Sequence, residues 1–189
     1  MIQNNVIQNS VIQNNATQSY FELFALQPAF DIDLTTLESH YRKIQSESHP
    51  DRFVNATSAE KLKSMQMATL ANEAYQVLKN PASRAKYLLA LQNIEAISET
   101  NTAMPADFLM QQMEWRETLE DAKAAKDMDA VDQLLNEIKQ EAKLLNKTLV
   151  SLIDEKQDYV SATDPTRKLI FIDKVCADIH KVIEQIENC

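Results

Sequence analysis

The sequence predicts an all-α protein, and three observations support that prediction. The 189 residues include no glycine, so β-hairpin turns, which favour glycine for its positive φ, are hard to build. Alanine, leucine, lysine, glutamate and glutamine, which favour helix, are abundant. Apolar residues recur at spacings of three and four, which is the period of a helix. Without glycine, asparagine must supply left-handed helix caps, and Asn80, Asn93 and Asn188 are the candidates.

The N-terminal segment, residues 1–18, is a polar repeat. Residues 2–16 read IQNNV, IQNSV and IQNNA, three copies of a pentapeptide. Such a unit is too short to stack as a solenoid and too polar to form a core. We interpret residues 1–18 as a disordered tail. The alternative is a Gln/Asn-rich segment whose interspersed Ile and Val residues recruit other chains by β-pairing.

Two helices are expected between this tail and Pro50. A short one begins at Tyr20 and stops before Pro28. A second begins after Asp31 or Asp33, both good N-caps. Its expected apolar stripe comprises Leu34, Leu37, Tyr41 and Ile44. Pro50 must end this second helix, because proline disfavours the α conformation of the residue before it.

A long helix and a shorter one follow the turn around Pro50. Ser58 is expected to cap the long helix. Its apolar face is expected to comprise Leu62, Met65, Thr69 or Leu70, Asn72 or Ala74, Tyr75 and Leu78. Asn80 and Pro81 then begin a helix that runs through Leu91. The two long helices are expected to pack antiparallel across the proline-bearing turn.

The rest of the chain predicts a linker and a three-helix bundle. Residues 93–104 are polar and weakly periodic, and Pro105 opens the next helical region. Helices are expected at about 105–125, 128–158 and 165–187. The stripes of the last two comprise Val131, Leu134 or Leu135, Ile138, Ala142, Leu145, Leu149 and Leu152, then Leu169, Ile172, Cys176, Ile179, Ile183 and Ile186. The expected domains are therefore residues 19–92 and 105–189.

Charge and composition exclude several classes of function. The net charge is −9, and residues 19–95 carry 9 acids and 8 bases, whereas residues 96–189 carry 19 acids and 11 bases. So acidic a chain lacks the basic surface that holds nucleic acid. The absence of glycine removes the P-loop, the dinucleotide-binding turn and the nucleophile elbow. We expect neither an enzyme nor a cofactor, and no nucleic-acid partner.

The chain also predicts a compartment. Its two cysteines, Cys176 and Cys189, form no CxxC motif and no disulfide framework, which suits a reducing environment. No segment resembles a membrane span, and the opening residues contain no apolar signal core. We expect a cytoplasmic protein of a bacterium, with no membrane partner.

The motifs of residues 19–92 carry a specific resemblance. They are, in order, His49-Pro50-Asp51, Asn72-Glu73-Ala74-Tyr75, Val77-Leu78, Asn80-Pro81 and Arg84-Ala85-Lys86-Tyr87. This arrangement resembles the J domain of DnaJ-type co-chaperones. The C-terminal region carries Phe108-Leu109-Met110, Glu114-x-Arg116-Glu117 and Arg167-Lys168-Leu169-x-Phe171-x-Asp173-Lys174. It resembles the C-terminal domain of the HscB family, the J-type co-chaperones of iron–sulfur cluster assembly.

The resemblance implies two partners. The His-Pro-Asp loop of such proteins engages a DnaK/HscA-class ATPase and stimulates its hydrolysis, which assigns that role to His49, Pro50 and Asp51. Family members add cations from the preceding helix, and Arg42 and Lys43 are the candidates here. The C-terminal bundle binds the IscU-type scaffold protein. Two departures bear on ATPase affinity: Ser48 stands where many J domains have an aromatic residue, and Arg52 replaces a frequent lysine.

A helical wheel suggests where the scaffold binds. In the helix that follows Pro105, one face of the wheel carries the core residues Phe108, Trp115, Leu119 and Ala122. The opposite side carries Leu109, Met110 and Met113, flanked by Glu114, Glu117 and Asp121, and Phe171 is a candidate extension from the last helix. An apolar patch rimmed by carboxylates fits a partner with basic groups. The alternative is a helix buried on both sides.

Three further hypotheses compete with this one. A general J protein would present unfolded clients to a DnaK-class chaperone, without preference for a cluster scaffold. An enzyme would use His49 and Asp51 as an acid–base pair, but no nucleophile or cofactor motif accompanies them. Cys176 and His180 have the spacing of metal ligands on one helix, yet the sequence offers no further ligand nearby, which favours a buried thiol beside a solvated histidine.

Overall fold

The computed structural model describes residues 19–97 and 104–187, and all regular structure in these ranges is helical. The helices, in chain order, are α2 (Tyr20–Leu23), α3 (Leu34–Glu47), the 3-10 turn η1 (Pro50–Phe53), α4 (Ser58–Lys79), α5 (Pro81–Leu91), α6 (Ala106–Ala125), α7 (Met128–Leu149), the π-helical segment η2 (Val150–Glu155) and α8 (Thr163–Glu187). The all-α prediction is confirmed. The predicted tail, residues 1–18, lies outside the described residues.

The described chain divides into two compact units. Residues 19–28 and 32–79 belong to the first, and residues 29–31 and 80–187 to the second. Helix α5 therefore counts with the C-terminal helices, because it packs against α8. The motifs led us to expect residues 80–92 within the J domain. Those bounds rest on the order of the motifs and not on packing, so they stay a prediction.

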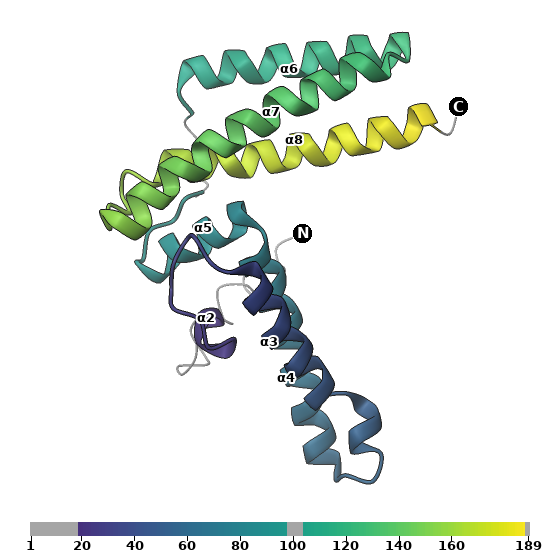
Figure 1. Ribbon diagram of the computed structural model, residues 1–189, viewed down its shortest axis with the longest axis vertical. Helices are drawn as coiled ribbons and strands as arrows, with labels where there is room; N and C mark the ends of the chain where they lie inside the picture. The colour runs from purple at the N-terminus through teal and green to yellow at the C-terminus, as the bar shows by residue number, and fades with distance from the viewer. Residues whose placement is uncertain (1–18, 98–103, 188–189) are drawn as a thin grey trace, which may run out of the picture. The chain divides into compact units, whose positions relative to one another are not determined.

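The first unit is a helical hairpin, and the short helix α2 packs against α4. Helices α3 and α4 run antiparallel and are joined through η1 (Figure 1). The rings of Tyr41 on α3 and Tyr75 on α4 stack at 4.1 Å between centroids. The hydroxyl of Tyr41 donates to Oδ1 of Asn72 at 2.7 Å. The predicted antiparallel pair of long helices is confirmed, and Asp33 is the N-cap of α3.

Helix α4 packs through three small side chains as well as through Tyr75 and Leu78. Leu62 and Met65, expected in its core face, are 57% and 63% exposed, and Leu34 of α3 is also exposed. These three expectations are wrong. The buried positions of α4 are Ser64, Ala71, Ala74, Tyr75 and Leu78. Small residues let two helices approach closely. The buried face of α4 therefore differs from the predicted one, which included its largest apolar side chains.

Thr57, not Ser58, caps α4. Its Oγ1 accepts from the backbone N–H of Glu60, and Oε2 of Glu60 accepts from the backbone N–H of Thr57 at 2.8 Å. This reciprocal pair is a capping box. The hydrogen bonds from Thr57 hold the pKa of Glu60 below its ordinary value of 4.5.

The second unit is built around α7, which packs against both α6 and α8 (Figure 1). Its core consists of large aliphatic and aromatic side chains, among them Phe108, Trp115, Val131, Ile138, Leu149, Ile172 and Ile179. The three-helix bundle and most of the predicted stripe are confirmed. On α8, Val175 and Val182 are buried, whereas Cys176, Ile183 and Ile186 are only half-buried.

The end of α7 differs from the single helix expected over 128–158. The α-helix ends at Leu149 and continues as η2. From η2, the carboxylate of Asp154 accepts from the backbone N–H groups of Phe30, at 2.7 Å, and Asp31, at 2.9 Å. The buried guanidinium of Arg84 donates to the carbonyl of Phe30 and lies over its ring. Residues 29–31 are thereby bonded to the second unit.

Left-handed caps occur without glycine. Within residues 19–97 and 104–187, the residues with positive φ are Ala25, Asn93, Lys126 and Gln157. Asn93 confirms its prediction, whereas Asn80 is an N-cap of α5 with φ −87°, and Asn188 lies outside the described residues. At the other positions a residue with a Cβ adopts a conformation that costs about 1 kcal/mol or more.

Candidate functional site

His49, Pro50 and Asp51 lie where the hairpin turns. His49 is the N-cap of η1, and its Nδ1 is 3.3 Å from the backbone N of Asp51 and 3.5 Å from the Asp51 carboxylate. A neutral ring accepts from the backbone N–H, whereas a protonated ring attracts the carboxylate. The side chains of His49 and Asp51 are 60% and 86% exposed. Both groups are available to a partner, in a turn fixed by proline.

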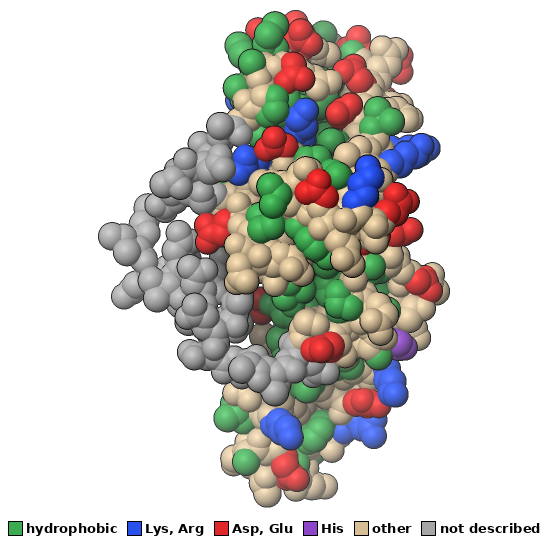
Figure 2. Space-filling model, turned by 90° about the vertical axis from the view of Figure 1, so that its left-hand side faces the viewer, with side chains coloured by type: hydrophobic (Ala, Val, Ile, Leu, Met, Phe, Trp, Pro, Cys, Tyr) green, Lys and Arg blue, Asp and Glu red, His purple; other side chains and the backbone are tan. Residues whose placement is uncertain are grey.

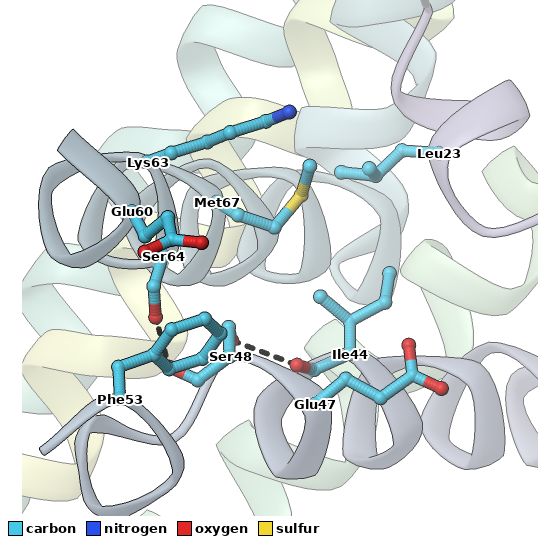
Figure 3. A pocket seen from close by; sticks show the side chains of 9 residues that line it. All are labelled: Leu23, Ile44, Glu47, Ser48, Phe53, Glu60, Lys63, Ser64 and Met67. Atoms are coloured by element: carbon cyan, nitrogen blue, oxygen red, sulfur yellow. Dashed lines mark hydrogen bonds between the residues drawn. The ribbon is translucent and has the colours of Figure 1, made fainter. Parts of the chain in front are cut away.

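Two serines anchor the chain just before this loop. Ser48 is buried, and its Oγ donates to the carbonyl of Ile44 at 2.7 Å. Ser64 of α4 is also buried, and its Oγ donates to the carbonyl of Ser48 at 2.7 Å. Both bonds are drawn in Figure 3. Thus Ser48, where many J domains have an aromatic residue, ties the loop to both long helices through small polar contacts.

A pocket of about 480 Å³ opens beside the serine pair. Its apolar lining comes from Leu23, Ile44, Phe53 and Met67, and Figure 3 shows Leu23, Ile44 and Met67 pointing toward one another. Ser48 and Ser64 also line it, with the charged residues Glu47, Glu60 and Lys63. This pocket was not predicted from the sequence. The serine at position 48 was the available signal, because a small residue there leaves space that a ring would occupy.

The two cations expected to assist the loop lie on the exposed side of α3. Arg42 pairs with Glu38 one turn earlier, with Nη2 and Oε1 2.5 Å apart. Lys43 is exposed as well. Both are one or two turns before the His-Pro-Asp loop on the same helix.

On α6, the predicted separation of two faces is confirmed. Phe108, Trp115, Leu119 and Ala122 are buried, whereas Leu109, Met110 and Met113 are 45%, 64% and 63% exposed. Burial on both sides is therefore excluded. We call Leu109, Met110 and Met113 the α6 patch. In Figure 2, hydrophobic and acidic side chains lie side by side over the helices of the second unit.

The charges around the α6 patch have both signs. The carboxylate-bearing residues Glu114, Glu117 and Asp121 are exposed, as expected. Phe171 of α8 is half-buried and packs edge-on against Phe108 at 5.9 Å between centroids, with the guanidinium of Arg116 over its ring. Phe171 thus contacts the core residue Phe108 on one side and the exposed cation Arg116 on the other.

Cys176 and His180 lie one turn apart on α8. Nδ1 of His180 is bonded to the carbonyl of Cys176 at 2.7 Å, and burial raises the pKa of the Cys176 thiol. Within residues 19–97 and 104–187, no group of three or more His, Cys, Asp or Glu side chains is placed to hold a metal ion. None of the helices described is both long and apolar enough to cross a membrane.

A helical hairpin with His-Pro-Asp at its turn, followed by a helical bundle, defines a J-domain co-chaperone. Residues 104–180 match the family model described as the HSCB C-terminal oligomerisation domain. The chain is 46% identical over 170 residues to a co-chaperone protein HscB homolog of Paraburkholderia phymatum, covering 90% of this chain and 97% of that protein. A Ralstonia nicotianae homolog is 45% identical, with 92% and 98% covered.

Solved structures agree. Chaperone HscB from Vibrio cholerae matches with a TM-score of 0.78 and 35% identity, covering 89% of this chain and 99% of that one. Human co-chaperone protein HscB matches with a TM-score of 0.80 and 30% identity, covering 88% and 82%. The chain belongs to the HscB family of co-chaperones.

Proposed function

We propose that this co-chaperone binds an iron–sulfur cluster scaffold protein of the IscU type through the α6 patch, and stimulates a DnaK/HscA-class ATPase through His49, Pro50 and Asp51. It catalyses no chemistry itself. The observation that carries the proposal is the exposure of the imidazole and carboxylate on a loop held by Pro50 and the serine pair. A preordered loop loses little conformational entropy on docking, so more of its contact energy appears as affinity. The expected location is the bacterial cytoplasm.

The second surface differs in kind and fits a second partner. Leu109, Met110 and Met113 supply flexible apolar contact area, and methionine adapts to irregular targets. Glu114, Glu117 and Asp121 favour a partner with basic residues near its apolar contact. The aromatic edge of Phe171 extends the surface toward α8.

His49→Gln tests the ATPase role. It keeps a side chain that can hydrogen-bond but removes the imidazole, so we expect stimulation of ATP hydrolysis to fall to the unstimulated rate, while scaffold binding and helicity stay unchanged. His180→Gln is the matched control, since His180 is also exposed. Steady-state ATPase assays with purified chaperone measure the result. Stimulation that survives His49→Gln contradicts the assignment.

Truncation of the α6 patch tests the scaffold role. Leu109→Ala, Met110→Ala and Met113→Ala together should weaken scaffold binding at least tenfold by calorimetry, because central apolar contacts each contribute about 1 kcal/mol or more. Leu144→Ala is the control, an exposed leucine on α7. Basal stimulation without scaffold should persist. Equal loss of binding to unrelated unfolded clients would favour a general J protein instead.

A further inference from the structure

The methionines of this chain lie on its surface and not in its cores. The structure describes six of the seven, and none of these six is buried. Two of them, Met104 and Met128, are half-buried. The exposed ones are Met65, Met67, Met110 and Met113. Methionine is ordinarily among the residue types most often buried, so this distribution indicates a role at the surface.

Two of the exposed methionines make up most of the α6 patch. Met110 and Met113 stand three apart, so they lie on one face of α6, about one turn from each other. Their side chains are 64% and 63% exposed, which leaves both thioether groups accessible to small solutes. Leu109 is the third member of the patch. A chemical change at the two sulfur atoms therefore alters most of the apolar surface that the patch presents.

A thioether reacts with hydrogen peroxide in a defined way. Peroxide transfers one oxygen atom to the sulfur, which loses two electrons and becomes a sulfoxide, and the rest of the peroxide leaves as water. Methionine sulfoxide reductases reverse the step. Two thiols are then oxidised to a disulfide, the sulfur regains its two electrons, and the oxygen leaves as water. The sulfoxide is a polar group where the thioether was apolar.

The bundle should stay folded when its methionines are oxidised. The buried residues of α6 are Phe108, Trp115, Leu119 and Ala122, and none of them is a methionine. Across residues 19–97 and 104–187 no methionine is buried, so no sulfoxide forms inside a described core. The Cys176 thiol competes poorly for peroxide, because burial raises its pKa and the thiol stays protonated.

We propose that Met110 and Met113 form a reversible oxidation site on the folded bundle, and that their oxidation switches off binding at the α6 patch. The sulfoxide oxygen accepts hydrogen bonds, and its burial against an apolar partner surface without a donor is unfavourable. Oxidation should therefore weaken scaffold binding at least about tenfold. The effect on the scaffold rests on the proposed function, whereas the oxidation site does not.

Peptide mass spectrometry of the peroxide-treated full chain tests the site without any partner. Met110 and Met113 should gain oxygen at least about threefold faster than the half-buried Met104 and Met128. Circular dichroism and the fluorescence of Trp115 should stay unchanged, because the oxidised side chains lie outside the core. Slower oxidation of the two α6 residues than of the half-buried pair, or loss of helicity on oxidation, overturns the proposal.

Calorimetry with an IscU-type scaffold, before and after peroxide treatment, tests the switch. Both cysteines are replaced by serine in every variant, and catalase removes the peroxide before mixing. The double variant Met110→Leu with Met113→Leu cannot form a sulfoxide on α6, so treatment should leave its affinity unchanged, whatever its starting value. Met65→Leu with Met67→Leu, which removes the exposed methionines of α4, is the matched control and should lose affinity as the parent does.

Each outcome of the binding experiment decides a separate point. Parent affinity that survives full oxidation of Met110 and Met113, or an equal loss in the α6 double variant, overturns the switch. Incubation with methionine sulfoxide reductases and dithiothreitol should restore both the mass and the affinity, and affinity that stays low after the mass has returned also overturns it. An untreated chain that does not bind the scaffold contradicts the proposed function and with it the switch, while the oxidation rates still decide the site.

Discussion

In the first unit, the binding loop presents one imidazole and one carboxylate from a backbone fixed by Pro50 and by the Ser64–Ser48 hydrogen bond. In the second unit, three flexible aliphatic side chains project from a regular helix whose other face is the core. A polar contact depends on direction and gains from a rigid loop, whereas an apolar contact depends on area and tolerates side-chain adjustment. The two surfaces are thus suited to different partners.

The buried faces of the helices in the two units also differ in composition. Helix α4 buries Ser64, Ala71 and Ala74 together with Tyr75 and Leu78, so small side chains supply much of its buried face. Helix α7 buries a continuous row of branched aliphatic side chains. Both units nevertheless expose large apolar side chains, Leu62 and Met65 on α4 as well as Leu109, Met110 and Met113 on α6.

The largest expected effect is a cavity in the bundle. Leu149→Ala removes a side chain with no exposed area, so the free energy of unfolding should fall by about 2 to 5 kcal/mol. Leu144→Ala, on the same helix but 58% exposed, should change it by less than about 0.5 kcal/mol. Trp115, the only tryptophan and buried in α6, reports unfolding of the bundle by fluorescence in urea. Similar losses in both variants would contradict the assigned core.

A smaller loss is expected at the segment of residues 29–31. Asp154→Ala removes the acceptor for two backbone N–H groups and leaves Arg84 with less compensation for its burial. Hydrogen bonds to charged groups contribute about 1.5 to 3 kcal/mol, so stability should fall within that range. Asp132→Ala, an exposed acid on α7, is the control. Amide hydrogen exchange should show faster exchange at Phe30 and Asp31 in the first variant only.

The sequence was sufficient for the helices and the bundle, because periodicity and caps are local. Asp33 and Asn80 cap the helices that they were expected to begin. The prediction from the sequence was wrong for α4. Leu62 and Met65 were expected in the core because they are large and apolar, but the buried positions include Ser64 and Ala71 instead. Which face of a helix is buried depends on its neighbours, which a single helical pattern does not specify.

For the candidate sites, the sequence located the residues but not their surroundings. The exposure of Leu109, Met110 and Met113 followed from the wheel, because Phe108 and Trp115 fix the opposite face. The Ser64–Ser48 bond, the pocket and the position of Arg116 over Phe171 join residues far apart in sequence. No local pattern encodes such contacts, so they required the folded arrangement of the helices.

The smallest expected effect concerns the capping box at the start of α4, beside the His-Pro-Asp loop. Thr57→Ala removes the side chain that accepts from the backbone N–H of Glu60, and loss of an N-cap costs about 1 kcal/mol. Hydrogen exchange in the first turn of α4 measures it. Ser58→Ala, the neighbour first expected to be the cap, should have little effect. Equal effects of the two substitutions would contradict the assignment of Thr57 as the N-cap of α4.

This capping box also gives the hairpin a pH dependence. The pKa of Glu60 is lowered by its hydrogen bonds from Thr57, so the ionised carboxylate stabilises the folded state. That contribution is complete above the ordinary pKa of 4.5 and is lost as the pH falls through the lower pKa of the folded chain. Protection of the first turn of α4 should therefore decrease in acid in the unmodified chain. The decrease should be smaller in Thr57→Ala, because the hydroxyl bond from Thr57, the largest cause of the lowered pKa of Glu60, is absent while the bond from the backbone N–H remains. This variant should leave the bundle signal of Trp115 unchanged at every pH.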